Sequence, residues 1–178
     1  MQVKLNGKVL ELIQGNIIEQ RDVDAIVNAA NAELRTGGGV AGAIHTAAGP
    51  QLYQACLPLA PIVHGDAVIT PGFNLHNKFI IHTLGPVYGI DKPSDYLLAR
   101  CYEHSIRLAD ENGLKSIAFP ALATGIFGYP IREAAEVALS TIKRFLPHTK
   151  HVQLVRMVLF TDNDLDIHED VLNDVVEQ

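Results

Sequence analysis

The sequence predicts an α/β protein built on a largely parallel β-sheet that helices cover on both faces. Short apolar runs typical of buried strands alternate along the chain with segments of helical periodicity. Two of these strands run into small-residue, glycine-containing connections that then open a helix. The chain has 178 residues, 48% of them hydrophobic, which suffices for one sizeable core. We therefore expect a single domain over residues 1–178.

The first half of the chain supplies most of the predicted strands. They are apolar runs at residues 3–5, 9–13, 24–27, 66–70 and 78–83. A helix is expected over 40–48, because its apolar residues recur at helical spacing. Gly49-Pro50 breaks that helix and separates it from a second helical piece over 51–57.

Helices and strands alternate more regularly in the second half. The expected helices cover 96–111, about 130–146 and 165–176, and the expected strands cover 116–120 and 152–160. The first of these helices ends near Asn112-Gly113, a common stop signal. Pro130 suits the first turn of the next helix, where a missing N–H costs nothing.

Charge and composition exclude several classes of function. The net charge is −6 and the Lys and Arg residues are scattered, which argues against binding to bulk nucleic acid. No apolar run reaches membrane-spanning length, and the N-terminus lacks the features of a signal peptide. Cys56 and Cys101 lie in apolar contexts without metal-ligand spacing, so we expect buried thiols and a cytoplasmic protein.

The first loop, residues 28–39, connects the strand over 24–27 to the helix that begins near Val40. It contains Asn28, Asn31 and the run Gly37-Gly38-Gly39. A strand, a glycine loop and a helix N-terminus in this order present free backbone N–H groups to an anion. A glycine-rich surface turn without a ligand is the alternative. The spacing of Gly37, Gly39 and Gly42 is not a dinucleotide-binding fingerprint, because that motif needs its first glycine right at the strand end and here Asn31 to Thr36 intervene.

The second loop, residues 121–130, resembles the first in its place. It also follows a buried strand and opens a helix. Ligands of open α/β sheets bind beyond the carboxyl ends of the strands, so the two loops could grip one diphosphate from both sides. Ile126 and Phe127 would then pack against a sugar or another flat group. Alternatively, the loops are two independent connections and Phe127 covers the core.

Several ordered motifs together resemble those of a known family. They lie at residues 14–17 (Gln-Gly-Asn-Ile), 24–31, 37–45, 81–86 and 119–130, and so extend over most of the chain. These motifs are similar to those of the macrodomains, which bind ADP-ribose. The pattern resembles most closely the bacterial branch that includes O-acetyl-ADP-ribose deacetylases and mono-ADP-ribosyl hydrolases.

The resemblance implies a fold and a ligand. The fold would be a three-layer α/β/α arrangement with a mixed, largely parallel sheet of about six strands. The ligand would be ADP-ribose, its O-acyl derivatives or mono-ADP-ribosylated proteins. The activity that the resemblance implies is hydrolysis of an ester at the distal ribose. We expect no cofactor, no metal, no contact with membranes and a monomeric chain.

The resemblance also assigns site residues. Gly37, Gly38, Gly39 and Val40 on the first loop and Thr124, Gly125, Ile126 and Phe127 on the second would cradle the diphosphate, with Ala41 and Ala123 beside them. Asn31 would hold the distal ribose against Phe127. Ile17 and Phe160 would flank the adenine, and Asn16 would accept a hydrogen bond from its amino group.

Two positions depart from the family pattern. Asn16 stands where the family usually has aspartate, so its bond to the adenine amino group would lack charge assistance. Ala41 stands where hydrolytic members commonly carry an acid, and alanine cannot activate water. A binding module with little turnover is therefore the alternative to an enzyme. Residual catalysis would depend on Asn31, on bound water and on the diphosphate as an internal base.

The histidines offer few candidates for chemistry. His45 lies one helical turn after Ala41 and is the single histidine considered for catalysis, although an internal hydrogen bond is the more usual role. His82, at a strand end, is expected to be structural. No metal-ligand spacing joins His64, His76, His104, His148, His151 and His168. Residues 162–166 lack the glycine and glutamate of a calcium loop and are expected to form a solvated turn that caps the last helix.

Overall fold

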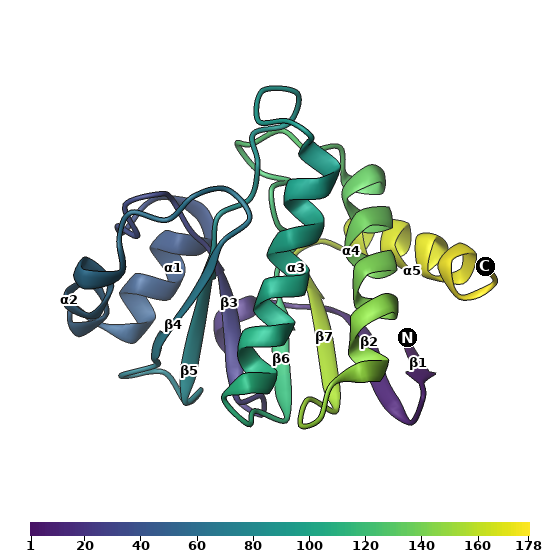
Figure 1. Ribbon diagram of the computed structural model, residues 1–178, viewed down its shortest axis with the longest axis horizontal. Coiled ribbons are helices and arrows are strands. Elements are labelled where there is room, and N and C mark those ends of the chain that lie inside the picture. Colours follow the sequence, from purple (N-terminus) through teal and green to yellow (C-terminus); the bar gives the residue numbers. More distant parts are fainter.

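The computed structural model describes residues 1–178 and contains one seven-stranded mixed sheet (Figure 1). In chain order the strands are β1 (Gln2–Leu5), β2 (Lys8–Gln14), β3 (Ala25–Ala29), β4 (Ala67–Pro71), β5 (Phe79–Thr83), β6 (Ser116–Phe119) and β7 (Leu154–Leu159). Their order in the sheet is β1-β2-β7-β6-β3-β5-β4. The expectation of about six strands is thus one too few. The seven apolar runs of the sequence agree with the structure, including the short run at residues 3–5, which is β1 and pairs with β2 through a tight turn at Asn6-Gly7.

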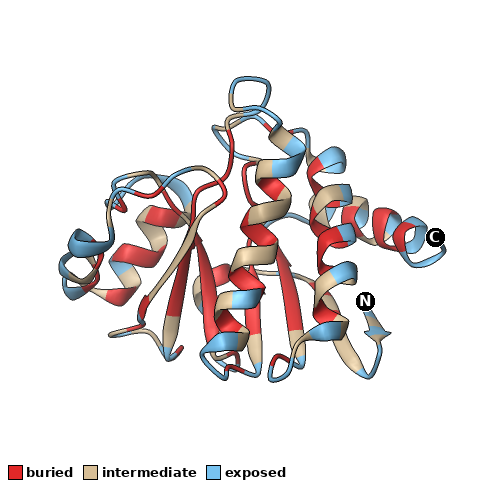
Figure 2. Ribbon diagram, viewed as in Figure 1, coloured by how far each residue is buried: buried red, intermediate tan, exposed pale blue.

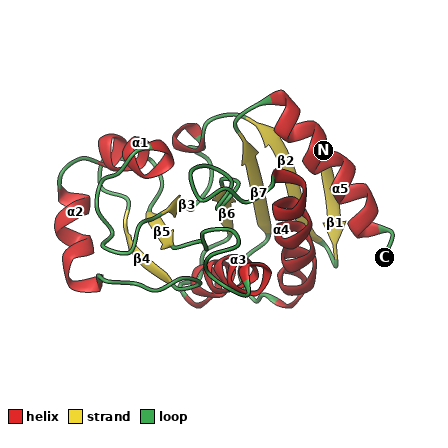
Figure 3. Cartoon of the chain, turned by 90° about the horizontal axis from the view of Figure 1, so that it is seen from above, coloured by secondary structure: helices red, strands yellow, loops and turns green.

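Parallel pairing dominates the sheet, as the sequence predicted. The strands β2, β7, β6, β3 and β5 pair in parallel, and β1 and β4 close the two edges in antiparallel fashion. Every central strand therefore ends at the same edge of the sheet. The segments that follow β2, β7, β6, β3 and β5 lie side by side there in this order (Figure 3).

Five helices and three short 3₁₀ turns complete the chain. They are α1 (Gly39–Ala48), α2 (Gln51–Cys56), α3 (Ser94–Glu111), α4 (Ile131–Phe145), α5 (Asp162–Val176), η1 (Ile17–Glu19), η2 (Leu57–Leu59) and η3 (Leu146–His148). The last helix begins three residues earlier than predicted, so residues 162–166 are its first turn and not a turn before it. Thr161 caps it by accepting a hydrogen bond from the N–H of Asp164 (3.1 Å). None of the helices is long and apolar enough to cross a membrane.

The helices form layers on both faces of the sheet, which gives the three-layer α/β/α fold. Two groups of buried apolar side chains show this division. The larger group joins one face of the sheet to α3, α4 and α5, and the smaller joins the other face to α1 and α2. Figure 2 shows the central strands buried between these layers. Cys56 and Cys101 are buried and free, one in each group, as predicted.

Candidate functional site

The first loop presents backbone N–H groups that no acceptor of the chain uses. The N–H groups of Gly37 to Ala41 make no hydrogen bond to a backbone carbonyl or to a side chain. Those of Gly39, Val40 and Ala41 belong to the first turn of α1, which has no preceding turn to accept them. The positive end of the helix dipole lies at the same place. This part of the loop can therefore hold an anion.

Gly42 allows the first loop to fold back onto α1. A Cβ atom at this position would lie 2.4 Å from the carbonyl oxygen of Gly37, closer than any real contact. The N–H of Gly42 donates to the carbonyl of Gly38 (3.2 Å), which fixes the same turn. Gly39 adopts a left-handed backbone (φ +56°) that side chains disfavour. The run of glycines thus has a backbone reason in addition to access for a ligand.

Asn31, Gly37 and Ala41 meet at one point of the first loop. A Cβ on Gly37 would lie 3.4 Å from Asn31 Nδ2 and 3.9 Å from Ala41 Cβ. The Asn31 amide closes a turn, because its Nδ2 donates to the carbonyl of Arg35 (2.9 Å) and its Oδ1 accepts from the N–H of Arg35 (2.8 Å). One N–H and one lone pair of this amide remain for a ligand.

The second loop carries a matching row of unpaired donors. The N–H groups of Thr124, Gly125, Ile126 and Phe127 make no hydrogen bond within the chain. Ala123, just before them, has a left-handed backbone (φ +67°), which is unusual for a residue other than glycine. Strain of this kind concentrates at functional sites because the surrounding structure has to hold it.

The loop's own hydrogen bonds hold that conformation. Tyr129 N–H donates to the carbonyl of Ala123 (3.0 Å), and Gly128 N–H donates to that of Gly125 (3.0 Å). The Thr124 hydroxyl donates to the carbonyl of Ala121 (2.8 Å). The row of donors is therefore fixed before any ligand arrives.

The two rows of N–H groups lie on loops that follow neighbouring strands. The first loop follows β3 and the second follows β6, and β3 and β6 pair in parallel through Ala25–Ile117 and Ile26–Ala118. Ile126, which is 91% exposed, and the half-buried Phe127 place apolar surface beside these donors. Both loops lie at the carboxyl edge of the sheet (Figure 3), and we call the two rows of donors with these apolar side chains the cradle.

The residues expected to bind adenine lie at the ends of β2 and β7. These strands pair in parallel, so the segment of Asn16 and Ile17 lies beside Phe160. Phe160 is 74% exposed, whereas Ile17 is almost fully buried and offers little surface. Asn16 Oδ1 accepts from the N–H of Ile18 (3.2 Å) and caps η1. Its second lone pair remains for another donor.

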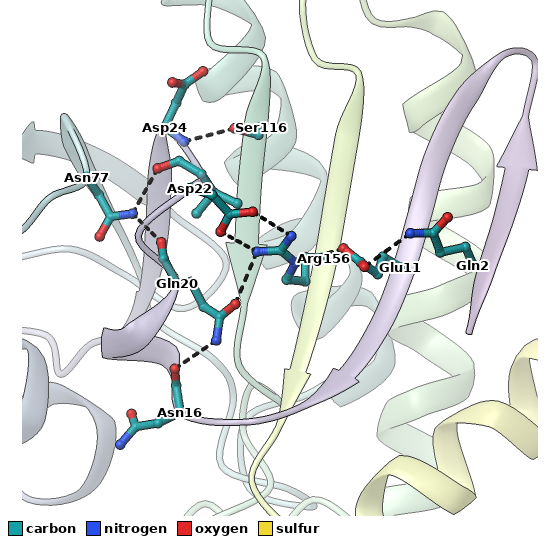
Figure 4. Close-up of polar contacts among 10 residues, drawn as sticks. Gln2, Glu11, Asn16, Gln20, Asp22, Asp24, Asn77, Ser116 and Arg156 are labelled. Carbon is teal, nitrogen blue, oxygen red and sulfur yellow. Dashed lines mark hydrogen bonds and ion pairs between the residues drawn. The ribbon is translucent and has the colours of Figure 1, made fainter.

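Arg156 holds the segment that contains Asn16 in place, a role that the sequence did not reveal. Its side chain is nine-tenths buried and forms two bonds to the Asp22 carboxylate (2.8 and 2.9 Å) and one to Glu11 (2.8 Å). It also donates to Gln20 Oε1 (3.1 Å), and Gln20 Nε2 donates to the carbonyl of Asn16 (3.0 Å), as Figure 4 shows. Arg156 thus connects the sheet to the backbone of Asn16.

This buried guanidinium changes the titration of its partners. Its hydrogen bonds lower the pKa of Asp22. Burial acts in the opposite direction on Glu11, but bonds from Arg156 and Gln2 outweigh it and lower its pKa as well. An arginine within an apolar strand is the sequence signal for such a network, because a buried charge needs partners.

His45 and His82 lie in the interior beneath α1. His82 accepts from Asn28 Nδ2 at Nδ1 (3.0 Å), so its proton is on Nε2, which donates to Thr70 Oγ1 (2.9 Å). Burial, with His45 nearby, lowers the pKa of His82 to about 3. This agrees with the structural role expected for His82. His45 is also buried, its Nε2 has no partner, and burial lowers its pKa. It therefore has little access to a ligand at the surface.

The structure gathers no group of three or more His, Cys, Asp or Glu side chains that could hold a metal ion. The chemistry available at this edge is hydrogen bonding from backbone N–H groups, together with the Asn31 amide and apolar contacts. Such a set suits an anionic ligand with a flat group at one end. The negative net charge of the chain argues against a general site for polyanions.

Comparison with known proteins finds one matching family model and several similar sequences. A family model described as Macro domain matches residues 27–138. A macro domain-containing protein of Chlorobaculum tepidum is 47% identical over 151 residues, which cover 84% of this chain and 88% of the relative. The ADP-ribose glycohydrolase MACROD2 of Xenopus laevis is 46% identical over 160 residues, which cover 88% of this chain but only 38% of that protein.

Solved structures show the same fold. The Oceanobacillus iheyensis macrodomain with ADP superposes with a TM-score of 0.94 at 42% identity, covering 99% of this chain and 96% of that one. The Trypanosoma brucei macrodomain in complex with ADP-ribose has a TM-score of 0.84 at 34% identity, covering 90% and 68%.

Proposed function

The chain belongs to the macrodomain family, and from this premise we propose that it binds ADP-ribose and its O-acyl or protein-linked derivatives. One observation carries the proposal. The two rows of unpaired N–H groups, Gly37–Ala41 and Thr124–Phe127, follow neighbouring parallel strands. A diphosphate between them would receive charge-assisted hydrogen bonds, each worth about 1.5–3 kcal/mol. Solved relatives bound to ADP and to ADP-ribose support this choice of ligand.

The remaining parts of the ligand follow from the order of the strands. The adenine would lie at the ends of β2 and β7, against Phe160 and near Asn16. The distal ribose would lie on the other side of the diphosphate, between Asn31 and Phe127. This direction follows from the sheet order β2-β7-β6-β3, because a ligand laid across these ends meets Phe160 before the two loops.

Hydrolysis of an ester at the distal ribose is the second candidate function. The similarity to an ADP-ribose glycohydrolase favours it. Ala41 argues against fast turnover, because its methyl group and not a carboxylate lies beside Asn31 and Gly37, and a missing general base costs on the order of 10²–10⁴-fold. Turnover would then use a water held by Asn31, with the diphosphate as its base. The buried His45 has no part in this scheme.

A pair of assays on one preparation tests both functions. Calorimetry measures the affinity for ADP-ribose, and a timed assay follows ADP-ribose release from a protein modified on a carboxylate. The wild type is compared with Ala41→Asp, and Ala41→Ser controls for size without adding an acid. Binding with release makes the chain a hydrolase, and binding without release makes it a reader of ADP-ribose. Absence of binding would overturn the proposal.

A gain of activity in Ala41→Asp but not in Ala41→Ser would show that the missing acid limits turnover. If neither variant gains activity while both bind ADP-ribose, the acid is not what limits the wild type, and the hydrolase candidate loses its explanation for slow turnover.

A further inference from the structure

A cavity of about 620 Å³ lies beside the second loop, outside the cradle described above. The segment between β5 and α3 forms one wall, and the end of the second loop with the first turn of α4 forms the other. In Figure 1 this segment rises above the carboxyl edge of the sheet. The lining residues are Tyr88, Gly89, Lys92, Pro93, Ser94, Asp95, Tyr129 and Glu133.

Hydrogen bonds fix the wall between β5 and α3. Asp91 accepts from the N–H of Val87 (2.8 Å) and lies 3.2 Å from His64 Nε2. The Ser94 hydroxyl donates to the carbonyl of Asp91 (2.6 Å) and accepts from the N–H of Gly89 (3.2 Å). The cavity is therefore bounded by an ordered turn on this side.

Tyr129 lines this cavity, and its hydroxyl has no partner within the chain. Tyr129 is only 4% exposed, and its hydroxyl makes no hydrogen bond within the chain, whereas the hydroxyl of Tyr88 donates to Glu133 Oε2 (2.8 Å). The two rings pack at 4.7 Å. Burial, with Asp95, Tyr88 and Glu133 nearby, raises the pKa of Tyr129 to about 12, so its hydroxyl is neutral at pH 7. The hydroxyl oxygen is not among the fully buried atoms without a partner, so it is open to solvent and can accept a hydrogen bond from a ligand in the cavity.

Negative charge in the cavity is not neutralised by the chain. Neither Asp95 nor Glu133 lies within ion-pair distance of a cation, and Lys92, which also lines the cavity, pairs with neither. One carboxylate oxygen of each acid remains free, because Asp95 Oδ1 accepts only from the N–H of Tyr96 and Glu133 Oε2 only from Tyr88.

The cavity is connected directly to the place proposed for the distal ribose. Tyr88 N–H donates to the carbonyl of Phe127 (2.9 Å), and Tyr129 follows Phe127 by two residues. Two residues of chain span roughly 7 Å. A protein attached to the distal ribose would therefore pass over this cavity within a few residues of its modified side chain.

We propose that the cavity receives an arginine side chain of the mono-ADP-ribosylated protein, close in sequence to the modified residue. The inference rests on the proposed binding of ADP-ribose. A guanidinium carries five N–H donors in one plane, enough for Asp95, Glu133 and the Tyr129 oxygen together. Its face can also lie against the Tyr88 ring, which attracts cations. Lysine would fit less well, because its compact ammonium group offers three donors in place of five.

Two modified peptides test this inference on the full chain. Both carry ADP-ribose on a central residue through a bond that resists hydrolysis. One has arginine two residues away on each side, and the other has citrulline there, which keeps the shape but not the charge. We expect the arginine peptide to bind about five-fold more tightly, the effect of roughly 1 kcal/mol for a half-exposed cation. Added salt should narrow this difference.

Substitutions in the cavity should remove the preference and leave the affinity for free ADP-ribose unchanged. Glu133→Gln removes one charge at the surface, and Tyr129→Phe removes the unpaired hydroxyl. Glu136→Gln is the matched control, because it removes the same charge from an exposed position of α4 outside the cavity. The control should retain the five-fold difference.

Equal affinities of the two peptides for the wild type would overturn the inference, and so would a preference that survives in Glu133→Gln. If free ADP-ribose binds in these experiments, such a result rejects only the arginine site. If free ADP-ribose does not bind, the proposed function fails instead, and the arginine site fails with it.

Discussion

Asn16 differs from an aspartate by one atom, an amide nitrogen in place of a carboxylate oxygen. Asn16 Oδ1 already accepts from the N–H of Ile18. We expect Asn16→Asp to keep this cap, because a carboxylate accepts the same bond, and to strengthen the bond from the adenine amino group by about 1 kcal/mol. Calorimetry should give about five-fold tighter binding of ADP-ribose. The analogue with hypoxanthine, which lacks the amino group, should gain nothing, and an equal gain for both would refute the assignment.

His82 should make stability depend on pH. Its pKa of about 3 in the folded chain lies below its ordinary value of 6.5, so the unfolded chain binds an extra proton between these values. The stabilising contribution is complete above pH 6.5 and is lost as pH falls towards 3, at roughly 1.4 kcal/mol per unit. Urea unfolding at pH 7 and 4.5 should show a smaller loss in His82→Gln than in the wild type. The exposed His76→Gln should behave as the wild type, and identical losses in all three would contradict this account.

At the residue scale, the sequence identified the loops but not what their side chains do. The asparagines and glycines were visible because their types suit turns and anions. The bonds from Asn31 to Arg35 were not, since an amide can serve either a turn or a ligand. The burial of Ile17 and the unpaired Tyr129 hydroxyl also depend on the packing of distant segments, which one sequence does not specify.

At the element scale, α1 and the first loop depend on Gly42. Alanine in a helix is ordinarily more stable than glycine by about 0.5–1 kcal/mol. Gly42→Ala should instead destabilise by roughly 1–3 kcal/mol and weaken ADP-ribose binding, because its methyl group would meet the Gly37 carbonyl and displace the loop. Unfolding curves and calorimetry measure the two effects.

Gly72→Ala is the matched control for Gly42→Ala. Its methyl group would meet the Asn77 carbonyl at 2.0 Å, a similar clash, but at the opposite edge of the sheet, beside the start of β5. It should lower stability and leave the ADP-ribose affinity of the folded protein unchanged. Similar losses of ADP-ribose affinity in both variants would mean that Gly42→Ala does not act by displacing the first loop.

Arg156 links β7 to β2 and to the segment before β3. Arg156→Met should destabilise by about 2 kcal/mol, less than a fully buried pair would lose, because the Asp22 side chain is 68% exposed. Arg132→Met removes an ion pair to Asp170 that is exposed on both sides and should cost under about 1 kcal/mol. Urea unfolding of both variants gives the comparison, and equal losses would show that burial of Arg156 does not matter.

The elements themselves were largely predictable, because the periods of apolar residues are local. The boundaries moved where caps act, as at Thr161, which starts α5 at Asp162. The network of Arg156 was not predictable in the same way. Its partners Glu11 and Asp22 are 145 and 134 residues away in the chain, and only the sheet order brings them together.

At the scale of the whole molecule, the parallel sheet determines where the site forms. All five parallel strands end at one edge, so loops that are distant in sequence become neighbours there. The alternation of strands and helices predicted this edge, while the order of the strands came only from the structure. That order places the ends of β2 and β7 beside the second loop, while the cavity at Tyr129 lies between the end of that loop and the segment after β5.

The central claim is that backbone N–H groups of two neighbouring loops bind the diphosphate. A titration of the ¹⁵N-labelled chain with ADP-ribose, followed amide by amide by NMR, tests it most directly. We expect the largest shifts at Gly37–Ala41 and Thr124–Phe127, the groups that have no acceptor in the chain. Binding that leaves these amides unmoved while others shift, or no binding at all, would contradict the account.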